Sequence, residues 1–149
     1  MQELWTLRKS AYWSCFALKE GAQSIVTDVC VPISSLGTVL ESVDKDIKKA
    51  GLLAPMVGHV GDGNFHLVIL HGEEDAHLAK DIEHNLMKRV LELEGTCSGE
   101  HGIGIEKKKW LEEELGLESV DIMRKIKKAI DPNGIFNPGK VFDMSSPKK

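Results

Sequence analysis

The segment GHVGDGNFHLVILH, residues 58–71, determines the expected fold of this 149-residue chain. Short apolar runs flank Gly61-Asp62-Gly63-Asn64, which is a strong signal for a β-hairpin. If Asp62-Gly63 is a two-residue turn, His59 lies directly opposite His66. Opposed residues share one face of a sheet, with Cβ atoms about 4.5–5.5 Å apart, so the two imidazoles could bind one metal ion. A histidine pair on a polar face of the sheet, without a metal, explains the same spacing.

The elements on either side of the hairpin follow from the spacing of apolar residues. A β-branched run at 24–33 predicts a strand before the hairpin. The glycine-rich segment 96–104 predicts a loop or a short strand after it. Apolar side chains at three- and four-residue spacing predict five helices, which cover residues 4–18, 36–47, 78–93, 107–115 and 119–130.

The order of elements from residue 24 to 105 is β-α-β-β-α-β, which predicts an α+β fold of the ferredoxin-like, split β-α-β type. In this fold an antiparallel sheet carries helices on one face, and here further helices flank it. We expect residues 1–23 to be a helix at the edge of the domain and residues 106–143 to be C-terminal helices with a returning segment. Residues 144–149 are expected to be a disordered tail. The flanking helices need a further surface to pack against, as in the C-terminal part of a larger protein.

The composition excludes several classes of protein. With 42% hydrophobic and 28% charged residues, the chain is too apolar and its charge too mixed for an intrinsically disordered protein. No apolar run reaches the roughly 18 residues that a membrane-spanning helix needs. A net charge of −4 gives no basic surface for nucleic acid. Three widely spaced cysteines favour a reducing compartment, and residues 1–20 show no secretory or transit signal.

The segment TCSGEHGIG, residues 96–104, is the second chemical signal. Its glycines allow the backbone to approach a ligand closely, and Glu100 and His101 supply a carboxylate and a titratable base. Together with His59 and His66, Glu100 would complete a set of two imidazoles and one carboxylate, which zinc, manganese and iron(II) accept. The alternative is a glycine-rich turn with two exposed polar residues.

Four motifs, in order along the chain, resemble the C-terminal half of the FAD-linked oxidases. The resemblance covers about residues 4–143, and within the family it is greatest to the mitochondrial branch that oxidises D-lactate and passes electrons to cytochrome c. Other branches act on D-2-hydroxyglutarate and on glycolate. The motifs are VTDVCVPISSL (26–36), GHVGDGNFH (58–66), TCSGEHGIG (96–104) and DPNGIFNPGK (131–140).

The resemblance implies a substrate and metal domain whose FAD is bound mainly by an N-terminal domain that this sequence lacks, so we expect the chain to be inactive alone. It also implies a D-2-hydroxy acid such as D-lactate as the substrate, cytochrome c as the electron acceptor and a mitochondrial location. The residues that match the family are His59, His66 and Glu100 as metal ligands, His101 as the active-site base, Arg8 as the partner of the substrate carboxylate and Asn137 near the flavin.

One departure from the family concerns the size of the substrate. The D-2-hydroxyglutarate branch has a threonine and a lysine for the distal carboxylate, where this chain has Tyr12 and Ile25-Val26-Thr27, and this difference disfavours a dicarboxylate. Two other functions are compatible with the residues. One is a metal-dependent hydrolase that uses Glu100 or His101 as a base, and the other is a non-catalytic ferredoxin-like binding module with structural histidines.

Overall fold

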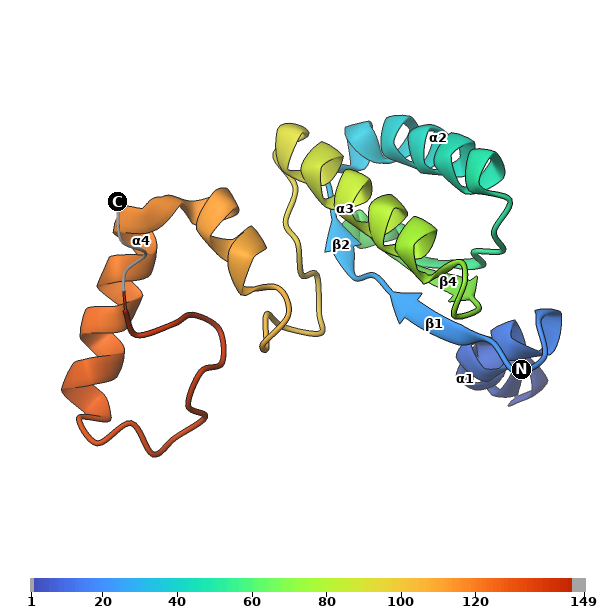
Figure 1. Ribbon diagram of the computed structural model, residues 1–149. Helices are drawn as coiled ribbons and strands as arrows, with labels where there is room; N and C mark the ends of the chain where they lie inside the picture. The colour runs from blue at the N-terminus through green and yellow to red at the C-terminus, as the bar shows by residue number, and fades with distance from the viewer. Residues whose placement is uncertain (1, 146–149) are drawn as a thin grey trace.

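Helices α2 and α3 lie together over one face of a four-stranded antiparallel sheet in the computed structural model, which describes residues 2–145 (Figure 1). The expected tail falls partly outside the described residues, since it includes 146–149. None of the helices in the described part of the chain is long and apolar enough to cross a bilayer. The elements are α1 (Gln2–Cys15), the 3-10 helix η1 (Phe16–Leu18), β1 (Gln23–Val26), β2 (Val29–Cys30), α2 (Ile33–Ala50), β3 (Met56–His59), the 3-10 helix η2 (Val60–Asp62), β4 (Asn64–His71), α3 (Ala76–Glu92) and α4 (Lys108–Ile130).

Strand β4 lies at the centre of the sheet and pairs with all the other strands. β1 and β2 follow each other along one of its edges in a single register, in which Val26 pairs with Val68 and Val29 with Phe65. β3 pairs with the other edge of β4. Thr96 forms an isolated bridge to β2, on the far side from β4. This spatial order is that of a split β-α-β sheet, and the predicted α+β class is confirmed.

The alternation of side chains along β4 separates a core face of the sheet from a second face, which we call the site face. The core-facing residues of β4 pack with α2 and α3 in the main hydrophobic core. On the site face, Cys15 of α1 packs against Val68 and Leu70, so both faces of β4 are covered and its residues are buried. The core-facing residues are Phe65, Leu67 and Ile69, and the site face of β4 carries Asn64, His66 and Val68.

The expected two-residue turn at Asp62-Gly63 is wrong, and with it the direct opposition of His59 and His66. The structure pairs His59 with Asn64 and places Val57 opposite His66, because the 3-10 helix η2 lengthens the connection. The two histidines still share the site face, as diagonal neighbours.

The longer turn is held by its contact with the segment after β2. Gly63 has a φ of 73°, and its carbonyl accepts a hydrogen bond from the N–H of Val31 at 3.0 Å. A Cβ atom at Gly63 would lie 2.0 Å from the carbonyl oxygen of Val31, so only glycine fits this approach.

The C-terminal part of the chain is a broken helix with a segment that returns along it. At Gly116 the backbone has φ 77° and ψ 156°, so α4 consists of two helices, as the sequence predicts. Buried Arg124 donates hydrogen bonds to Glu112, Asp121 and the carbonyl of Asp143, which fastens the returning segment to the second helix.

Two helical surfaces keep large apolar side chains exposed. The apolar stripe predicted for the first helix is buried only near its end, at Cys15, and the second half of α4 also has an exposed apolar face. Helix faces that expose several large apolar side chains are typical of surfaces that pack against another structure. The exposed residues include Leu4, Trp5, Leu7, Trp13, Ile122, Ile126 and Ile130.

Candidate metal and substrate site

Three side chains from separate segments converge on the site face of the sheet. His59 ends β3, His66 lies within β4, and Glu100 belongs to the loop between α3 and α4. Nε2 of His66 is 2.9 Å from Oε1 of Glu100, and Nε2 of His59 is 3.3 Å from the same oxygen. The two imidazole centroids are 5.6 Å apart.

The chemistry and spacing of these donor atoms fit a divalent cation. Zinc binds imidazole nitrogen and carboxylate oxygen at about 2.0–2.2 Å, which separates neighbouring ligand atoms of a tetrahedral site by about 3.3–3.6 Å. The separations of 2.9 and 3.3 Å need only a small expansion to reach that range. Three protein ligands would leave at least one coordination position for a substrate, in zinc, manganese or iron(II) alike.

The protonation of His66 is set by the backbone. Its Nδ1 lies 3.2 Å from the carbonyl oxygen of Thr27. Because a carbonyl only accepts, Nδ1 carries a proton in this contact, which leaves Nε2, on the side of Glu100, as the nitrogen that would bind a cation. A hydrogen bond of this kind behind a ligating histidine is usual in metal sites.

His59 is held in the opposite tautomer by Arg8. Nη2 of Arg8 lies 3.2 Å from Nδ1 of His59, and a guanidinium only donates, so Nδ1 accepts and Nε2 of the neutral ring carries the proton. A cation at Nε2 would require the proton on Nδ1. Arg8 could then no longer donate to this histidine, and its guanidinium would be available to an anionic group of a substrate.

His101 stands at the open side of the cluster. Its ring stacks on that of His66 with a centroid distance of 4.9 Å and an interplanar angle of 11°. Its Nε2 is 3.8 Å from Oε1 of Glu100, and its side chain is 52% exposed. His101 therefore contacts the cluster and solvent at once, as a group that exchanges protons with water must.

A pocket of about 760 Å³ opens in front of these side chains. Arg8 and Lys9 supply its positive charge, while the remaining walls away from the histidines are largely apolar. Such a lining suits a small anion with an apolar substituent. The other wall residues are Ala11, Tyr12, Val26, Val57 and Val68.

Asp28 is the functional candidate that the sequence reasoning missed. Its carboxylate is 1% exposed and, with His66, Glu100 and His101, belongs to a group whose potential ligand atoms lie within 4.8 Å of one another. Burial raises the pKa of Asp28, but hydrogen bonds from the backbone of His101 and Glu100 and from side chains outweigh it and hold the pKa below its ordinary value. The sequence did contain one indication of this role, since Asp28 is an acidic residue within the β-branched run 24–33.

Two sets of possible ligands can be distinguished. The group that contains Asp28 does not include His59, whereas the set of side chains that meet at Oε1 of Glu100 does. We favour the set with His59, because the oxygens of Asp28 already accept hydrogen bonds on both sides. A ligand oxygen would have to give up some of these donors.

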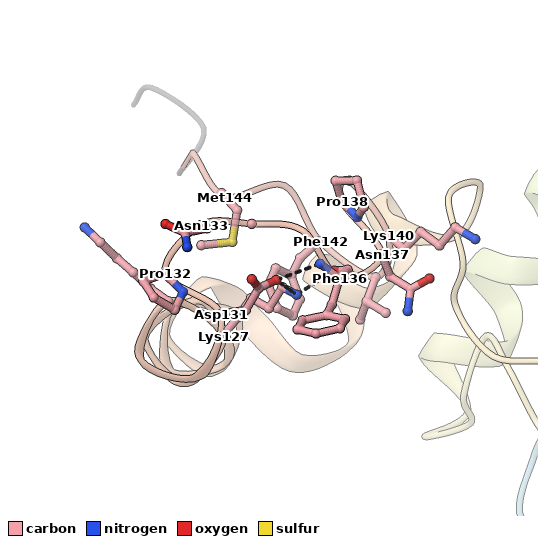
Figure 2. Close-up of a pocket in the computed structure, with 14 residues that line it drawn as sticks. Lys127, Asp131, Pro132, Asn133, Phe136, Asn137, Pro138, Lys140, Phe142 and Met144 are labelled. Carbon is pink, nitrogen blue, oxygen red and sulfur yellow. Dashed lines mark hydrogen bonds and ion pairs between the residues drawn. The ribbon is translucent and has the colours of Figure 1, made fainter.

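Asn137 lies apart from the histidine cluster. It lines a different pocket of about 550 Å³, formed by the end of α4 and the returning segment (Figure 2). In that pocket Asp131 accepts hydrogen bonds from Lys127 and from the N–H of Phe136. The N–H of Val141 donates to the carbonyl of Gly104 at 2.6 Å, which links this segment to the loop that carries Glu100.

Comparison with known proteins adds an independent line of argument. The family model described as FAD linked oxidases, C-terminal domain, matches residues 1–141. Among curated proteins, the mitochondrial D-lactate dehydrogenase (cytochrome) of Arabidopsis thaliana is 43% identical over 144 residues, which are 95% of this chain and 25% of that protein.

Two further relatives show the same pattern of coverage. The mitochondrial D-lactate dehydrogenase (cytochrome) 1 of Saccharomyces cerevisiae is 45% identical over 145 residues, with 94% of this chain and 25% of the relative covered. Glycolate oxidase subunit GlcD of Bacillus subtilis is 31% identical over 145 residues, with 95% and 30% covered. The chain thus spans about a quarter of the length of the mitochondrial relatives that it matches.

Proposed function

This chain belongs to the FAD-linked oxidases as a C-terminal domain, and we propose that it is the substrate- and metal-binding region of an enzyme that oxidises a D-2-hydroxy acid. D-lactate is the favoured substrate, with pyruvate as the product. The observation that supports this most is the approach of His59 and His66 to one oxygen of Glu100, at 3.3 and 2.9 Å, beside a pocket with a cationic wall.

The metal and the flavin would supply the Lewis-acid and redox chemistry of the reaction. A divalent cation held by His59, His66 and Glu100 would lower the pKa of the substrate hydroxyl, and FAD would accept the C2 hydrogen with its electron pair. The residues of this chain bind the substrate, orient it and move its proton.

His101 is the proposed base. Its side chain is half exposed and stacks on His66, so its Nε2 borders both the cluster and solvent. A neutral imidazole can take the hydroxyl proton near neutral pH and release it to water.

Arg8 is the proposed partner of the substrate carboxylate. It lines the pocket, and its Nη2 contacts Nδ1 of His59. A bidentate pair between guanidinium and carboxylate would fix the direction in which C2 presents its hydrogen. Tyr12 and Val26 line the same pocket where the D-2-hydroxyglutarate branch carries groups for a distal carboxylate, and this difference from that branch favours a monocarboxylate, with Lys9 as a further cation of the wall.

The flavin and electron-transfer assignments rest on the relatives. The resemblance to the family implies that Asn137 lies near the flavin, and the hydrogen bond from Val141 to Gly104 connects its segment to the loop of Glu100. Cytochrome c as the acceptor and a mitochondrial location are proposed by similarity to the relatives described as mitochondrial D-lactate dehydrogenases (cytochrome).

Two measurements test the proposal. The purified chain should bind one equivalent of Zn2+ or Mn2+, and His66→Ala should abolish binding. A chimera in which this chain replaces the matching quarter of the yeast relative should contain flavin whose absorbance is bleached by D-lactate. A chimera that binds flavin and metal but is not bleached would refute the dehydrogenase role, and metal-dependent ester cleavage by the chain alone would favour a hydrolase.

A further inference from the structure

We propose that Asp28 is a positioning residue for the site: its buried carboxylate holds the segment 98–101, so that Glu100 and His101 face His66. The inference rests on the proposed function, since it concerns how this chain orders its own metal-binding and proton-transfer groups. Asp28 itself is assigned no contact with metal or substrate.

The register of the sheet places Asp28 beside the cluster. Val26 pairs with Val68 and Val29 with Phe65, so Asp28 lies opposite His66 on the site face. Its Oδ1 is 3.7 Å from Nδ1 of His66. Asp28 is thus held within the sheet, next to His66, which is the proposed metal ligand on β4.

The loop between α3 and α4 is hydrogen-bonded to the carboxylate of Asp28. Oδ2 of Asp28 accepts hydrogen bonds from Oγ of Ser98 at 2.9 Å, from the N–H of Glu100 at 3.0 Å and from the N–H of His101 at 2.8 Å. Within this loop Glu100 and His101 have proposed chemical roles, and their backbone N–H groups both donate to this oxygen. Buried charge-assisted hydrogen bonds of this kind are stronger than neutral ones.

The other side of the carboxylate is anchored to the sheet. Oδ1 accepts from Nδ2 of Asn64 at 2.9 Å, and Asn64 also donates to the carbonyl of Val29. Nζ of Lys107 lies 3.6 Å from Oδ2 and offsets the negative charge. Since both oxygens are occupied, the carboxylate connects the loop with the sheet and does not serve as a ligand.

Gly99 permits this arrangement. A Cβ atom at Gly99 would lie 2.1 Å from Nδ2 of Asn64 and 3.0 Å from Oδ1 of Asp28. The first glycine of the GEHGIG motif is therefore required for the loop to reach the carboxylate. The absence of a side chain at Gly99 thus lets the segment 98–101 pack closely against Asp28 and Asn64.

The test is the Zn2+ affinity of the purified chain, measured by competition with a chelator. Asp28→Asn replaces one acceptor oxygen by an amide N–H group, which would face either the donors of the loop or the amide of Asn64, and we expect affinity to fall about 10- to 100-fold. Asp46→Asn is the control, because Asp46 also accepts a hydrogen bond from a charged partner, Arg89, between α2 and α3 and outside the cluster. It should leave the affinity unchanged.

A double-mutant comparison separates positioning from general damage. If Asp28 acts through Glu100, adding Asp28→Asn to Glu100→Gln should weaken Zn2+ binding no further, whereas adding it to His59→Ala should. Additive losses in the combination with Glu100→Gln would overturn the proposal, because Asp28 would then act as an independent ligand or as a general structural residue.

Amide hydrogen exchange gives a readout that does not depend on metal. In Asp28→Asn the amides of Glu100 and His101 should exchange about tenfold faster or more, while that of Ile69 in β4 stays protected. Unchanged exchange in the loop, or equal acceleration at Ile69, would overturn the proposal. If the native chain bound no Zn2+ but the loop alone lost protection, the metal assignment would fail and the anchoring role of Asp28 would stand.

Discussion

Nδ1 of His66 donates a hydrogen bond to the carbonyl of Thr27 at 3.2 Å, from β4 to the residue that follows β1. In a regular ladder this carbonyl would accept the N–H of Leu67, but that N–H donates to Oγ1 of Thr27 at 3.0 Å. The side chain of Thr27 thus replaces its own carbonyl in the sheet. The carbonyl is thereby free to orient the imidazole, whose Nε2 faces Glu100.

Thr27→Val should weaken metal binding and stability together. The N–H of Leu67 would lose its acceptor and compete for the carbonyl that holds His66, so we expect a loss of about 1–3 kcal/mol in the free energy of unfolding. Zn2+ affinity should fall about tenfold. Urea denaturation and chelator competition measure the two effects, and Thr38→Val on the exposed face of α2 is the control. Unchanged affinity in a destabilised Thr27→Val chain would show that the imidazole does not need this carbonyl.

His101→Ala should separate metal binding from catalysis. In the chimera with the yeast relative, the rate of flavin bleaching by D-lactate should fall about 10²- to 10⁴-fold, because the proton of the hydroxyl has no base to accept it. Metal content should be unchanged, since His101 is not a proposed ligand. His77→Ala, an exposed histidine on α3, should keep the native rate. A bleaching rate of native size in His101→Ala would assign the proton transfer to another group.

Gly63→Ala should be much more damaging than Gly61→Ala. The first change adds a Cβ atom 2.0 Å from the carbonyl oxygen of Val31, at a residue with a φ of 73°. We expect a loss of about 2–3 kcal/mol or more in the free energy of unfolding. A Cβ atom at Gly61 meets nothing within 4 Å, so that variant should differ little from the native chain. Equal stability of the two variants in urea would contradict the turn described here.

The segment after α4 should loosen in acid. The hydrogen bond from Lys127 is the largest influence on Asp131, and together with the N–H groups of Phe136 and Ile135 it outweighs burial and lowers the pKa of Asp131 from 3.8 to about 2. A lowered pKa means that the native segment favours the ionised carboxylate, so this stabilisation is complete above about pH 4 and is lost as the pH falls toward 2.

Amide chemical shifts of Ile135 and Phe136 report this transition. In the native chain they should change between about pH 4 and pH 2. In Asp131→Asn they should show the released state already at neutral pH. Shifts of the native segment that stayed constant down to pH 2 would contradict the role given to Asp131.

Local patterns were enough to predict much of this protein. Helical spacing, glycine breaks and β-branched runs are properties of neighbouring residues, and they placed the helices, the two strands of the hairpin and the break near Gly116 correctly, but not the turn of the hairpin. The same patterns identified the α+β class and singled out His59, His66, Glu100 and His101 in two motifs, and the resemblance to the FAD-linked oxidases implied their roles.

The tertiary structure decided how those residues meet. Turn length depends on the contact of Gly63 with Val31, which no local rule reveals, and it changed the partner of His59 from His66 to Asn64. The role of Asp28 was equally hidden, because its carboxylate serves a loop that is distant in the chain. A sequence pattern shows which groups are available, whereas hydrogen bonds and packing between distant segments determine which of them share a site.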